Sequence, residues 1–422
     1  MDYKILVAHP GQQHSFQTAS ALKRNNILAC YVTTVYDKET SLLMKCIKRL
    51  ISGTNRVKAA NRKTSELDDV DIVLYGELMG FVEIFLNRYD RSKIIYRWWH
   101  KKTSDYFGKK VALLAIKMDV DAVIMYDTNA NACFKILKKR APSILRVMDV
   151  TAANRLYMKT IYESDMTMAP NFAKKLKTEV RSLWNKEFCN RCLEEIELTQ
   201  LFLSPSKFVK TSLQFSGVKS EQIEICPYGT NFLPIEKQYD YSINRPLRVI
   251  YVGNVTEMKG ISYLLKAAMQ IPQEIVQFTI VGYYDNSTHI FDQYMDHIHF
   301  TGRILHDQVR DILRASDIFV FPSLGEGLSL SVLEAMACGL PCIVSKNSGA
   351  NDAIANGING FVIDIQDANA IYDRIMWFVE HREEIPKMGR EALERVKKYQ
   401  WQGNYDSILV KILTQRMSSR SI

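Results

Sequence analysis

Residues 316–345 read S-D-I-F-V-F-P-S-L-G-E-G-L-S-L-S-V-L-E-A-M-A-C-G-L-P-C-I-V-S, and this stretch decides the fold. Residues 317–321 form a short apolar run of β-branched and aromatic side chains, which indicates a buried strand. A proline and two glycines then predict a loop. A helix should follow Ser329, its expected N-cap, because apolar positions recur at helical spacing until Gly339. With a further strand at residues 342–345, this is the β-loop-α-β unit of a parallel sheet.

Two carboxylates bracket the start of this helix. Glu326 lies in the loop and Glu334 follows after seven intervening residues, so both can face a ligand at the helix N-terminus. Unpaired backbone N–H groups and the positive end of the helix dipole favour a phosphate there. We expect these N–H groups to come from Gly327, Leu328 and Ser329. The arrangement predicts a site for an anion that also carries hydroxyl groups.

The two glutamates, the intervening G-L-S-L-S-V-L and the following A-M-A-C-G-L-P resemble the E-x7-E signature of the glycosyltransferase 4 family, which are retaining enzymes that use nucleotide sugars. The resemblance is strongest over residues 198–365. It implies the α/β fold called GT-B, in which two Rossmann-like, doubly wound domains face each other across a cleft. From the residues alone, the alternative is that both glutamates are ordinary solvated side chains of a surface helix.

The order of apolar runs in the first half of the chain also predicts a doubly wound sheet. The carboxyl ends of parallel strands meet at one edge, where open α/β sheets bind ligands. The candidate groups that follow expected strands there are Glu77, Trp99, His100, Asp127, Asn129 and Asp149. His100 could instead be a partly buried histidine on a carbonyl group, and Asp127 a helix N-cap. The expected strands are residues 3–8, 27–33, 71–75, 94–96, 122–126 and 144–147.

Two segments of the first half depart from the resembled family. The loop of residues 9–14, before a helix from Ser15, is usually richer in glycine and approaches the donor phosphate or the acceptor. Here only Gly11 remains, and the resemblance places Gly11, Gln12 and His100 on the acceptor side. Residues 227–231 read P-Y-G-T-N, where the family more commonly has P-N-G-V-D.

The resemblance divides the chain into four parts. Residues 1–231 would form an acceptor-binding Rossmann-like domain, and the polar residues 232–246, which include two prolines, a linker. Residues 247–395 would form a Rossmann-like domain that binds the nucleotide sugar. Residues 396–422 would form a C-terminal helix that crosses back to the first domain. In the second domain, further strands are expected at residues 247–253, 277–282 and 299–302.

By resemblance, the donor diphosphate would be held in the turn after the strand that ends at Gly253. The family usually has an arginine directly after this glycine and a lysine five residues beyond it. Lys259 matches the lysine, whereas Asn254 stands at the arginine position. A neutral group makes a weaker hydrogen bond than a cation, so weaker donor binding or a substitute cation is implied. Arg303 is the nearest candidate for that cation, and Lys259 could otherwise be a solvated turn lysine.

The resemblance implies transfer of a hexose-type sugar from a nucleotide diphosphate to an acceptor hydroxyl, with retention of anomeric configuration. Glu334 would hold the ribose, Glu326 the donor sugar, and Lys259 the leaving diphosphate, whose developing charge fixed dipoles also stabilise. His100 or Asp127 would orient the acceptor. No D-x-D pair suits a divalent ion, so we expect no metal and no cofactor beyond a UDP- or GDP-linked co-substrate.

The net charge of +9 is concentrated in the first half of the chain. Residues 1–240 carry 37 Lys and Arg against 26 Asp and Glu, whereas the remainder carries 18 against 20. Basic clusters with aromatic neighbours such as Trp98, Tyr106 and Phe107 suit anionic lipid headgroups or nucleic acid, and otherwise form solvated helix faces. No nucleic-acid recognition motif is present, so we expect peripheral contact with an anionic membrane surface and no nucleic acid.

The start of the chain shows no signal peptide, and no apolar run approaches the roughly 18 to 20 residues that span a bilayer. We therefore expect a cytoplasmic protein with peripheral membrane contact. Its acceptor would be a lipid-linked or growing glycan, because the family makes lipopolysaccharide, capsule and glycolipids. A second class of function is a non-catalytic nucleotide-sugar-binding or scaffolding protein, which Asn254 and the glycine-poor first loop favour.

Overall fold

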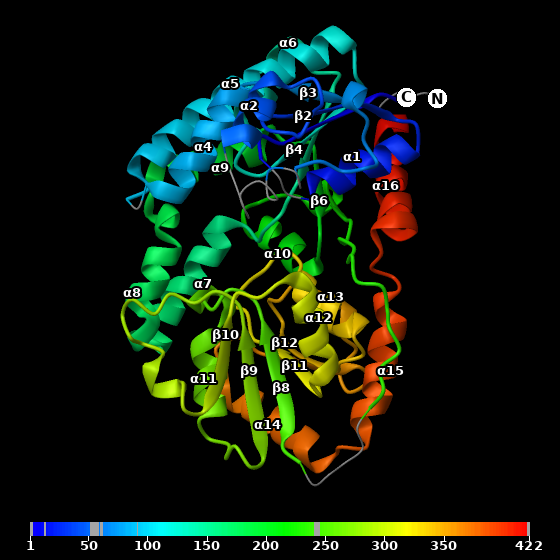
Figure 1. Cartoon of the computed structure of the whole chain (residues 1–422). Coiled ribbons are helices and arrows are strands. Elements are labelled where there is room, and N and C mark those ends of the chain that lie inside the picture. Colours follow the sequence, from blue (N-terminus) through cyan, green and yellow to red (C-terminus); the bar gives the residue numbers. More distant parts are fainter. Residues whose placement is uncertain are drawn as a thin grey trace.

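The computed structural model describes residues 3–11, 14–50, 59, 62–90, 92–239 and 245–419. Two parallel β-sheets form the centres of two α/β domains, and the first domain lies above the second in Figure 1. Helices pack around each sheet. The predicted fold class, two doubly wound Rossmann-like domains, is confirmed.

The first sheet has seven parallel strands: β1 (Ile5–Ala8), β2 (Leu28–Thr33), β3 (Ile72–Leu74), β4 (Ala122–Tyr126), β5 (Leu145–Asp149), β6 (Leu201–Ser204) and β7 (Ile223–Ile225). Their order is β3-β2-β1-β4-β5-β6-β7, so the direction of winding reverses between β1 and β4. Every residue of these two strands is buried, as expected for a parallel sheet covered on both faces. Ligand sites of open sheets lie at such a reversal, outside the carboxyl ends of the strands.

Helices of the first domain are α1 (Ser15–Arg24), α2 (Leu42–Leu50), α4 (Glu77–Tyr89), α5 (Ile94–Met118), α6 (Asn131–Arg140), α7 (Arg155–Met168), α8 (Pro170–Glu179), α9 (Lys186–Leu198) and α10 (Lys207–Phe215). The strand predicted at residues 94–96 is wrong, because these residues begin α5. A short apolar run suits either element, and burial of Phe107, Val111 and Ala115 on one helix face decides it. Phe107 is fully buried, so its predicted place on a membrane-facing surface is also wrong.

The second sheet has six parallel strands: β8 (Leu247–Val252), β9 (Val276–Val281), β10 (Ile298–Gly302), β11 (Ile318–Phe321), β12 (Cys342–Ser345) and β13 (Gly360–Ile363). Their order is β10-β9-β8-β11-β12-β13. Its helices are α11 (Ile261–Ala268), α12 (His306–Ala315), α13 (Leu330–Ala337), α14 (Ala368–Glu380) and α15 (Glu384–Val396). The predicted unit at residues 316–345 is confirmed as β11, α13 and β12.

After α15 the chain returns to the first domain and ends in α16 (Asp406–Ser418), which lies beside α1 in Figure 1. The hydroxyl groups of Thr18 and Tyr405 lie 2.8 Å apart, and Arg24 donates two hydrogen bonds of 2.8 Å to Asp406. Leu409, Leu413 and Met417 recur at helical spacing and are buried. Apolar packing and a bidentate ion pair therefore both attach this helix to the first domain.

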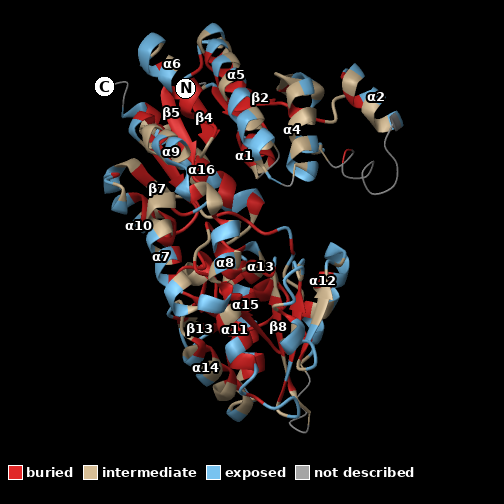
Figure 2. Ribbon diagram, turned by 90° about the vertical axis from the view of Figure 1, so that its left-hand side faces the viewer, coloured by how far each residue is buried: buried red, intermediate tan, exposed pale blue. Residues whose placement is uncertain are grey.

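The two domains share an extensive contact. Helices α7 and α8 precede the second domain in sequence but reach it in space: the Tyr263 hydroxyl donates to Asp165 Oδ1 at 2.7 Å, and the Met258 N–H donates to Glu179 at 3.4 Å. Buried apolar residues of both sheets belong to one continuous cluster, visible as the buried colour running through both halves of Figure 2. Among the described helices, none is both long and apolar enough to cross a bilayer.

Packing of α16 should account for a measurable share of stability. Leu413 is fully buried, so Leu413→Ala should lower the free energy of unfolding by about 2 to 5 kcal/mol through lost burial and a cavity. Lys411→Ala, on the exposed face of the same helix, should change it by less than about 0.5 kcal/mol. Urea unfolding of both variants measures this, and equal effects would contradict the packing described for α16.

Candidate functional site

The turn after β8 carries the predicted cation. Gly260 closes the turn with a positive φ of 67°, and a Cβ built on it would lie 2.1 Å from the carbonyl oxygen of Pro322. Only glycine fits both constraints. The close approach brings Lys259 against the loop after β11, where its amino group forms an ion pair with Glu326. Two residues that the sequence predicted for one donor site therefore meet.

Glu326 is held from several sides. Its Oε1 also accepts a hydrogen bond from the Ser323 hydroxyl at 3.1 Å, and its own N–H donates to the Asn347 carbonyl at 2.9 Å. The side chains of Lys259 and Glu326 are 22% and 17% exposed. The pair is therefore ordered yet still reachable by a ligand.

Glu334 lies on α13, eight residues after Glu326, and its side chain is 17% exposed. Its Oε1 is 3.5 Å from Nε2 of His306, at the start of α12. Burial raises the pKa of Glu334 above its ordinary value. A partly desolvated carboxylate with one weak partner is well suited to accept hydrogen bonds from hydroxyl groups of a ligand.

The N-terminus of α13 differs from the prediction in part. Ser329 occupies the N-cap position but its side chain makes no cap, and its hydroxyl lies 3.1 Å from that of Ser331. Its N–H donates to the Ser348 carbonyl at 3.2 Å, so the prediction of an unpaired N–H at Ser329 is wrong. The N–H groups of Gly327 and Leu328 donate to no group in the described part of the chain. Two donors, rather than three, remain for an anion.

The position expected to hold an arginine is neutral and exposed. Asn254 follows Gly253 at the end of β8, and its carbonyl accepts hydrogen bonds from the Tyr251 hydroxyl and the Thr256 N–H. Arg303 follows β10 at the same sheet edge, two strands away, with its guanidinium 4.8 Å from the ring centre of Tyr283. It adds positive charge to this edge but forms no hydrogen bond with Asn254 in the described part of the chain, and its role as substitute cation stays a prediction.

Two buried carboxyl groups lie beneath the turn that carries Lys259. Glu257 accepts a hydrogen bond of 2.6 Å from the Ser262 hydroxyl, and Asp165 accepts one from Tyr263. Burial raises the pKa of both carboxyl groups, and the negative charge of Asp165 raises the pKa of Glu257 further. Like charges repel each other more strongly away from water, so burial and the neighbouring acid both favour the protonated form. Protonation lowers the cost of burying two acids at this contact between the domains.

The first domain contacts the backbone of the loop after β11, which carries Glu326 and Gly327 and is called the donor loop below. A Cβ built on Gly327 would lie 2.0 Å from the carbonyl oxygen of Thr151, just beyond β5, so a larger residue does not fit there. The Ser206 hydroxyl donates to the Gly327 carbonyl at 2.7 Å. Asp127, at the carboxyl end of β4, accepts hydrogen bonds from the N–H and hydroxyl of Thr151 at 3.0 and 2.7 Å. Asp127 thus braces the segment that touches the donor loop.

His100 is not at a strand end. It lies on α5, and its Nδ1 is 2.8 Å from Glu83 on α4, so it joins two helices of the first domain. The strand that motivated its acceptor role does not exist, and we assign it no role in the site. Of the other acceptor-side residues, Gly11 donates its N–H to Nδ1 of His9 at 2.8 Å. Gln12 lies outside the described residues.

His14 is a site residue that the sequence analysis did not select. It lies at the start of α1, with Nε2 3.0 Å from Oδ2 of Asp149 at the carboxyl end of β5. The Tyr228 hydroxyl donates to Oδ1 of the same carboxylate at 3.0 Å. Neighbouring His9 is buried, which lowers its pKa to about 4 and keeps it neutral at pH 7. Only the position of His14 in the loop after the first strand could have pointed to it.

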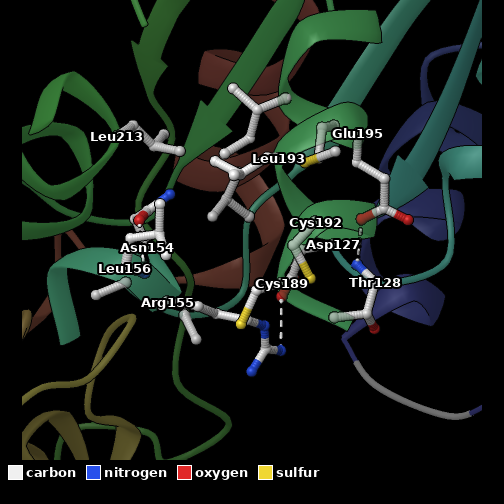
Figure 3. Close-up of a pocket in the computed structure, with 15 residues that line it drawn as sticks. Asp127, Thr128, Asn154, Arg155, Leu156, Cys189, Cys192, Leu193, Glu195 and Leu213 are labelled. Atoms are coloured by element: carbon white, nitrogen blue, oxygen red, sulfur yellow. Dashed lines mark hydrogen bonds and ion pairs between the residues drawn. The ribbon is translucent and has the colours of Figure 1, made fainter. Parts of the chain in front are cut away.

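A pocket of about 40 Å³ lies between the carboxyl ends of β4 and β5 and helix α9 (Figure 3). Cys189 and Cys192 line one side, and Glu195 points to the backbone of Thr128. This volume is far below the roughly 300 to 1,000 Å³ of pockets that enclose a drug-sized ligand, so it does not identify a substrate site. Within the described ranges, no three His, Cys, Asp or Glu side chains gather so that they could hold a metal ion.

Glu195 stabilises the end of this pocket. Its carboxylate accepts hydrogen bonds from the N–H groups of Thr128 and Asn131 at 2.8 and 3.0 Å, and so caps the N-terminus of α6. Because the carboxyl group is buried, its pKa is raised to about 7. Glu195 therefore connects the end of β4 to α6 and α9, and its carboxyl group titrates near neutral pH.

Residues 246–381 match the protein family described as "Glycosyl transferases group 1". A stretch of 135 residues is 33% identical to a UDP-Gal:α-D-GlcNAc-diphosphoundecaprenol α-1,3-galactosyltransferase of Escherichia coli and covers 30% of this chain and 34% of that protein. A stretch of 185 residues is 28% identical to the amylovoran biosynthesis glycosyltransferase AmsK of Erwinia amylovora and covers 41% of this chain and 46% of that protein. The chain spans about half the length of the first curated relatives that it matches, 46 to 54%.

Solved structures resemble the whole chain. A sucrose-phosphate synthase from Thermosynechococcus elongatus superposes with a TM-score of 0.66 at 17% identity, covering 99% of both chains. The HepE protein of Anabaena, in complex with UDP, superposes with a TM-score of 0.58 at 13% identity, covering 98% of this chain and 100% of that one. At these identities the likeness supports the fold alone.

Glu195 should make stability depend on pH. An ordinary glutamate in the unfolded chain loses its proton near pH 4.5, whereas folded Glu195 keeps it to about pH 7. The contribution of Glu195 to stability therefore falls by about 3 kcal/mol as the pH rises through this window and is constant above it. Glu195→Gln should remove this part of the pH dependence, and Glu197→Gln, exposed on the same helix, should retain it. Urea unfolding from pH 4 to 8 tests this, and an unchanged slope in Glu195→Gln would contradict it.

Proposed function

We propose that this chain, whose fold is GT-B and whose residues 246–381 match a glycosyltransferase family, moves a sugar from a nucleotide-diphosphate donor to an acceptor hydroxyl. The observation that carries the proposal is the meeting of Lys259 with Glu326, beside the free N–H groups of Gly327 and Leu328. One cation, one carboxylate and two amide donors then face one ligand. A diphosphate joined to a hydroxylated sugar requires such groups: the cation and the amides bind phosphate oxygens, and the carboxylate accepts hydrogen bonds from sugar hydroxyl groups.

In the proposed reaction, negative charge develops on the departing diphosphate. Lys259 and the two amide donors lie where they can stabilise that charge, and such fixed groups supply much of the rate enhancement in acyl and phosphoryl chemistry. Glu326 would bind hydroxyl groups of the donor sugar, and Glu334 those of the ribose. The reaction would proceed with retention at the sugar carbon and without a metal or further cofactor.

We propose UDP as the donor nucleotide, ahead of GDP. The E. coli relative names UDP-galactose as its donor, and the HepE structure holds UDP. Asn254 leaves Lys259 as the main cation of the turn, so the affinity for the diphosphate should be modest. Arg303, at the same sheet edge, would add a second positive charge.

The acceptor we propose is a glycan carried on a membrane lipid or a growing polysaccharide. The two relatives above act, by their names, on a diphosphoundecaprenol-linked sugar and in the synthesis of amylovoran. An acceptor of this kind lies at a membrane surface, so the enzyme must reach that surface. The first domain has a surface that suits contact with a membrane.

The α4–α5 surface is formed by exposed apolar side chains at the turn between these helices: Ile84, Phe85, Tyr89, Ile94, Ile95 and Trp98. Phe85 is 59% and Trp98 is 54% exposed, although such side chains are usually buried. Exposed Arg88, Arg97 and Lys102 adjoin them, and the Lys102 amino group lies 3.9 Å from the ring centre of Trp98. Apolar groups for the acyl boundary and cations for anionic headgroups occur together on peripheral membrane proteins. We propose that this surface contacts an anionic bilayer.

A second candidate function is a nucleotide-sugar-binding protein without activity. The neutral Asn254, in the position where the resembled family has a cation, favours it. Turnover of a bound donor distinguishes the two functions.

Substitutions of Glu326 and Glu334 should affect sugar transfer and donor binding differently. In a thermal-shift panel of UDP, GDP and ADP with their common sugar conjugates, UDP conjugates should raise the melting temperature, because a ligand of the native state stabilises it. Glu326→Ala should lower turnover at least about 100-fold with little change in folding, and Glu334→Ala should mainly reduce the UDP shift. Glu394→Ala, which removes an exposed ion pair elsewhere in the second domain, should change neither. Normal turnover in both site variants would remove the site assignment.

The α4–α5 surface should bind vesicles in a salt-sensitive way. The protein should sediment with vesicles containing phosphatidylglycerol at low salt and be released at high salt, because screening weakens the contact of each cation. A double change, Phe85→Ser with Trp98→Ser, should abolish sedimentation without loss of stability. Phe215→Ser, also exposed at 56% but on α10, is the matched control and should sediment normally. Equal sedimentation of both variants would rule out this surface.

A further inference from the structure

Glu334 is a largely buried acid that the described part of the chain leaves without a close partner. Its side chain is 17% exposed, and its partner in an ion pair is Nε2 of His306, 3.5 Å from Oε1. Burying a carboxylate without hydrogen bonds is costly, so such a group either takes up a proton or is stabilised by neighbouring charges. The neighbours of Glu334 therefore decide how well it accepts hydrogen bonds from a ligand.

Arg310 is a second cation near Glu334. His306 and Arg310 are four residues apart on α12, so their side chains lie on the same face of that helix. Arg310 makes no hydrogen bond or ion pair within the described residues, and its Nε is buried without a partner. Burial raises the pKa of Glu334, and the charges of His306 and Arg310 act against that rise.

The ring of Phe232 fixes the place of both basic side chains. The His306 ring meets it edge-on, with the ring centres 4.9 Å apart, and the guanidinium carbon of Arg310 lies 4.5 Å from the same ring centre. Phe232 is 1% exposed, so its own position is set by the packing around it. An aromatic face attracts a guanidinium group even where no acceptor is present. The two side chains are therefore ordered, although neither is bound tightly by Glu334.

The charge of Glu334 depends on α12 and on burial. Strands β11 and β12 and helix α15 also pack against α13, but none of their charged groups in the described ranges acts on this carboxyl group. Within α13, the nearest titratable group is the thiol of Cys338, one turn further on. Burial raises the pKa of this thiol to about 11, so it is neutral at pH 7.

The group lies at the donor end of the second domain. Helices α12 and α13 lie next to each other in Figure 1, and His306 begins α12 directly after the turn that follows β10. Glu334 follows Leu330, the first residue of α13, by four residues, or about 6 Å along the helix axis. The free N–H groups of Gly327 and Leu328 precede the same helix. A nucleotide whose diphosphate binds there can place its ribose against Glu334.

We propose that His306 and Arg310 are positioning residues of the ribose site, which keep the carboxylate of Glu334 ionised and directed at the two hydroxyl groups of the donor ribose. An ionised carboxylate only accepts hydrogen bonds and has room for two hydroxyl donors. Such bonds are roughly twice as strong as those to a neutral acceptor. The two basic residues thereby set the affinity for the donor and its preference for ribose over 2′-deoxyribose. This inference rests on the proposed transferase function.

The test measures binding of the UDP-sugar that gives the largest thermal shift, by calorimetric titration of the full chain from pH 5 to 9. A UDP-sugar has no titrating phosphate in this range, because its diphosphate is esterified at both ends. Affinity should rise with pH as Glu334 loses its proton. Arg310→Gln removes a cation and so raises the pKa of Glu334 further, which should move the midpoint to higher pH. Near the acidic end, Kd should increase about 10-fold, whereas at pH 9 it should change little.

Arg310→Lys separates charge from packing. It keeps the positive charge but loses the planar group on Phe232, so the midpoint should stay near that of the unchanged chain. A purely structural role would make Arg310→Lys and Arg310→Gln equally weak binders. His381→Gln, at the end of α14 and far from the first domain in Figure 1, is the matched control and should bind normally.

The preference for ribose gives a second readout. At pH 7 the unchanged chain should bind the UDP-sugar about 10-fold more tightly than its 2′-deoxy analogue, because the analogue loses a hydrogen bond to a charged acceptor. Glu334→Gln should remove most of this ratio and the dependence on pH, and His306→Gln should reduce the ratio. With saturating donor, kcat of His306→Gln should stay within about twofold, since the lost interaction contributes equally to the ground state and the transition state.

Three outcomes would decide against the inference or its premise. If both Arg310→Gln and His306→Gln keep the midpoint and the ribose ratio of the unchanged chain, they do not position Glu334, although the transferase proposal stands. An unchanged pH dependence in Glu334→Gln would also overturn the inference. If the unchanged chain binds no UDP-sugar at any pH, the proposed function fails and this inference fails with it.

The melting temperature without ligand identifies a variant that does not fold. His306 is 64% exposed, so His306→Gln should fold even where Arg310→Gln does not. The midpoint and the ribose ratio of His306→Gln then decide the inference.

Discussion

The backbone contact between Gly327 and Thr151 is the constraint on which the rest of the structure depends. It joins the loop that precedes α13 to the loop that follows β5, and it leaves no room for a side chain at residue 327. Ser206 adds a hydrogen bond to the same carbonyl group. Because backbone atoms set this distance, the side chains beside the loop after β11 are held in a fixed relation to those at the carboxyl ends of the strands of the first domain.

Several charged groups around that contact are paired. Lys259 faces Glu326, and Arg155 lies 3.6 Å from Asp127. Helix α7 also brings an acid of the first domain, Asp165, close to Glu257 in the turn that carries Lys259, and burial raises the pKa of both carboxyl groups. Burial thereby favours the protonated form, which lessens the repulsion between the two acids.

The returning C-terminal segment has a part beyond stability. Helix α16 is attached to α1 by Arg24 and Asp406, and the turn before it places Trp401 over the loop that holds Tyr228. Helix α1 begins at Ser15, and His14 precedes it as the N-cap residue. The same packing that fixes the last helix therefore also fixes His14 at the carboxyl edge of the first sheet.

Sequence alone determined the β11, α13 and β12 unit, its two glutamates and Lys259, because apolar periodicity and glycine positions are local properties of the chain. It was wrong for residues 94–96 and for the place of His100 at a strand end, since a short apolar run has no local feature that separates helix from strand. Only the tertiary structure decided that His14, Asp149 and Tyr228 meet. These residues are far apart in sequence, and their contact depends on the order of β1, β4 and β5, which no local pattern records.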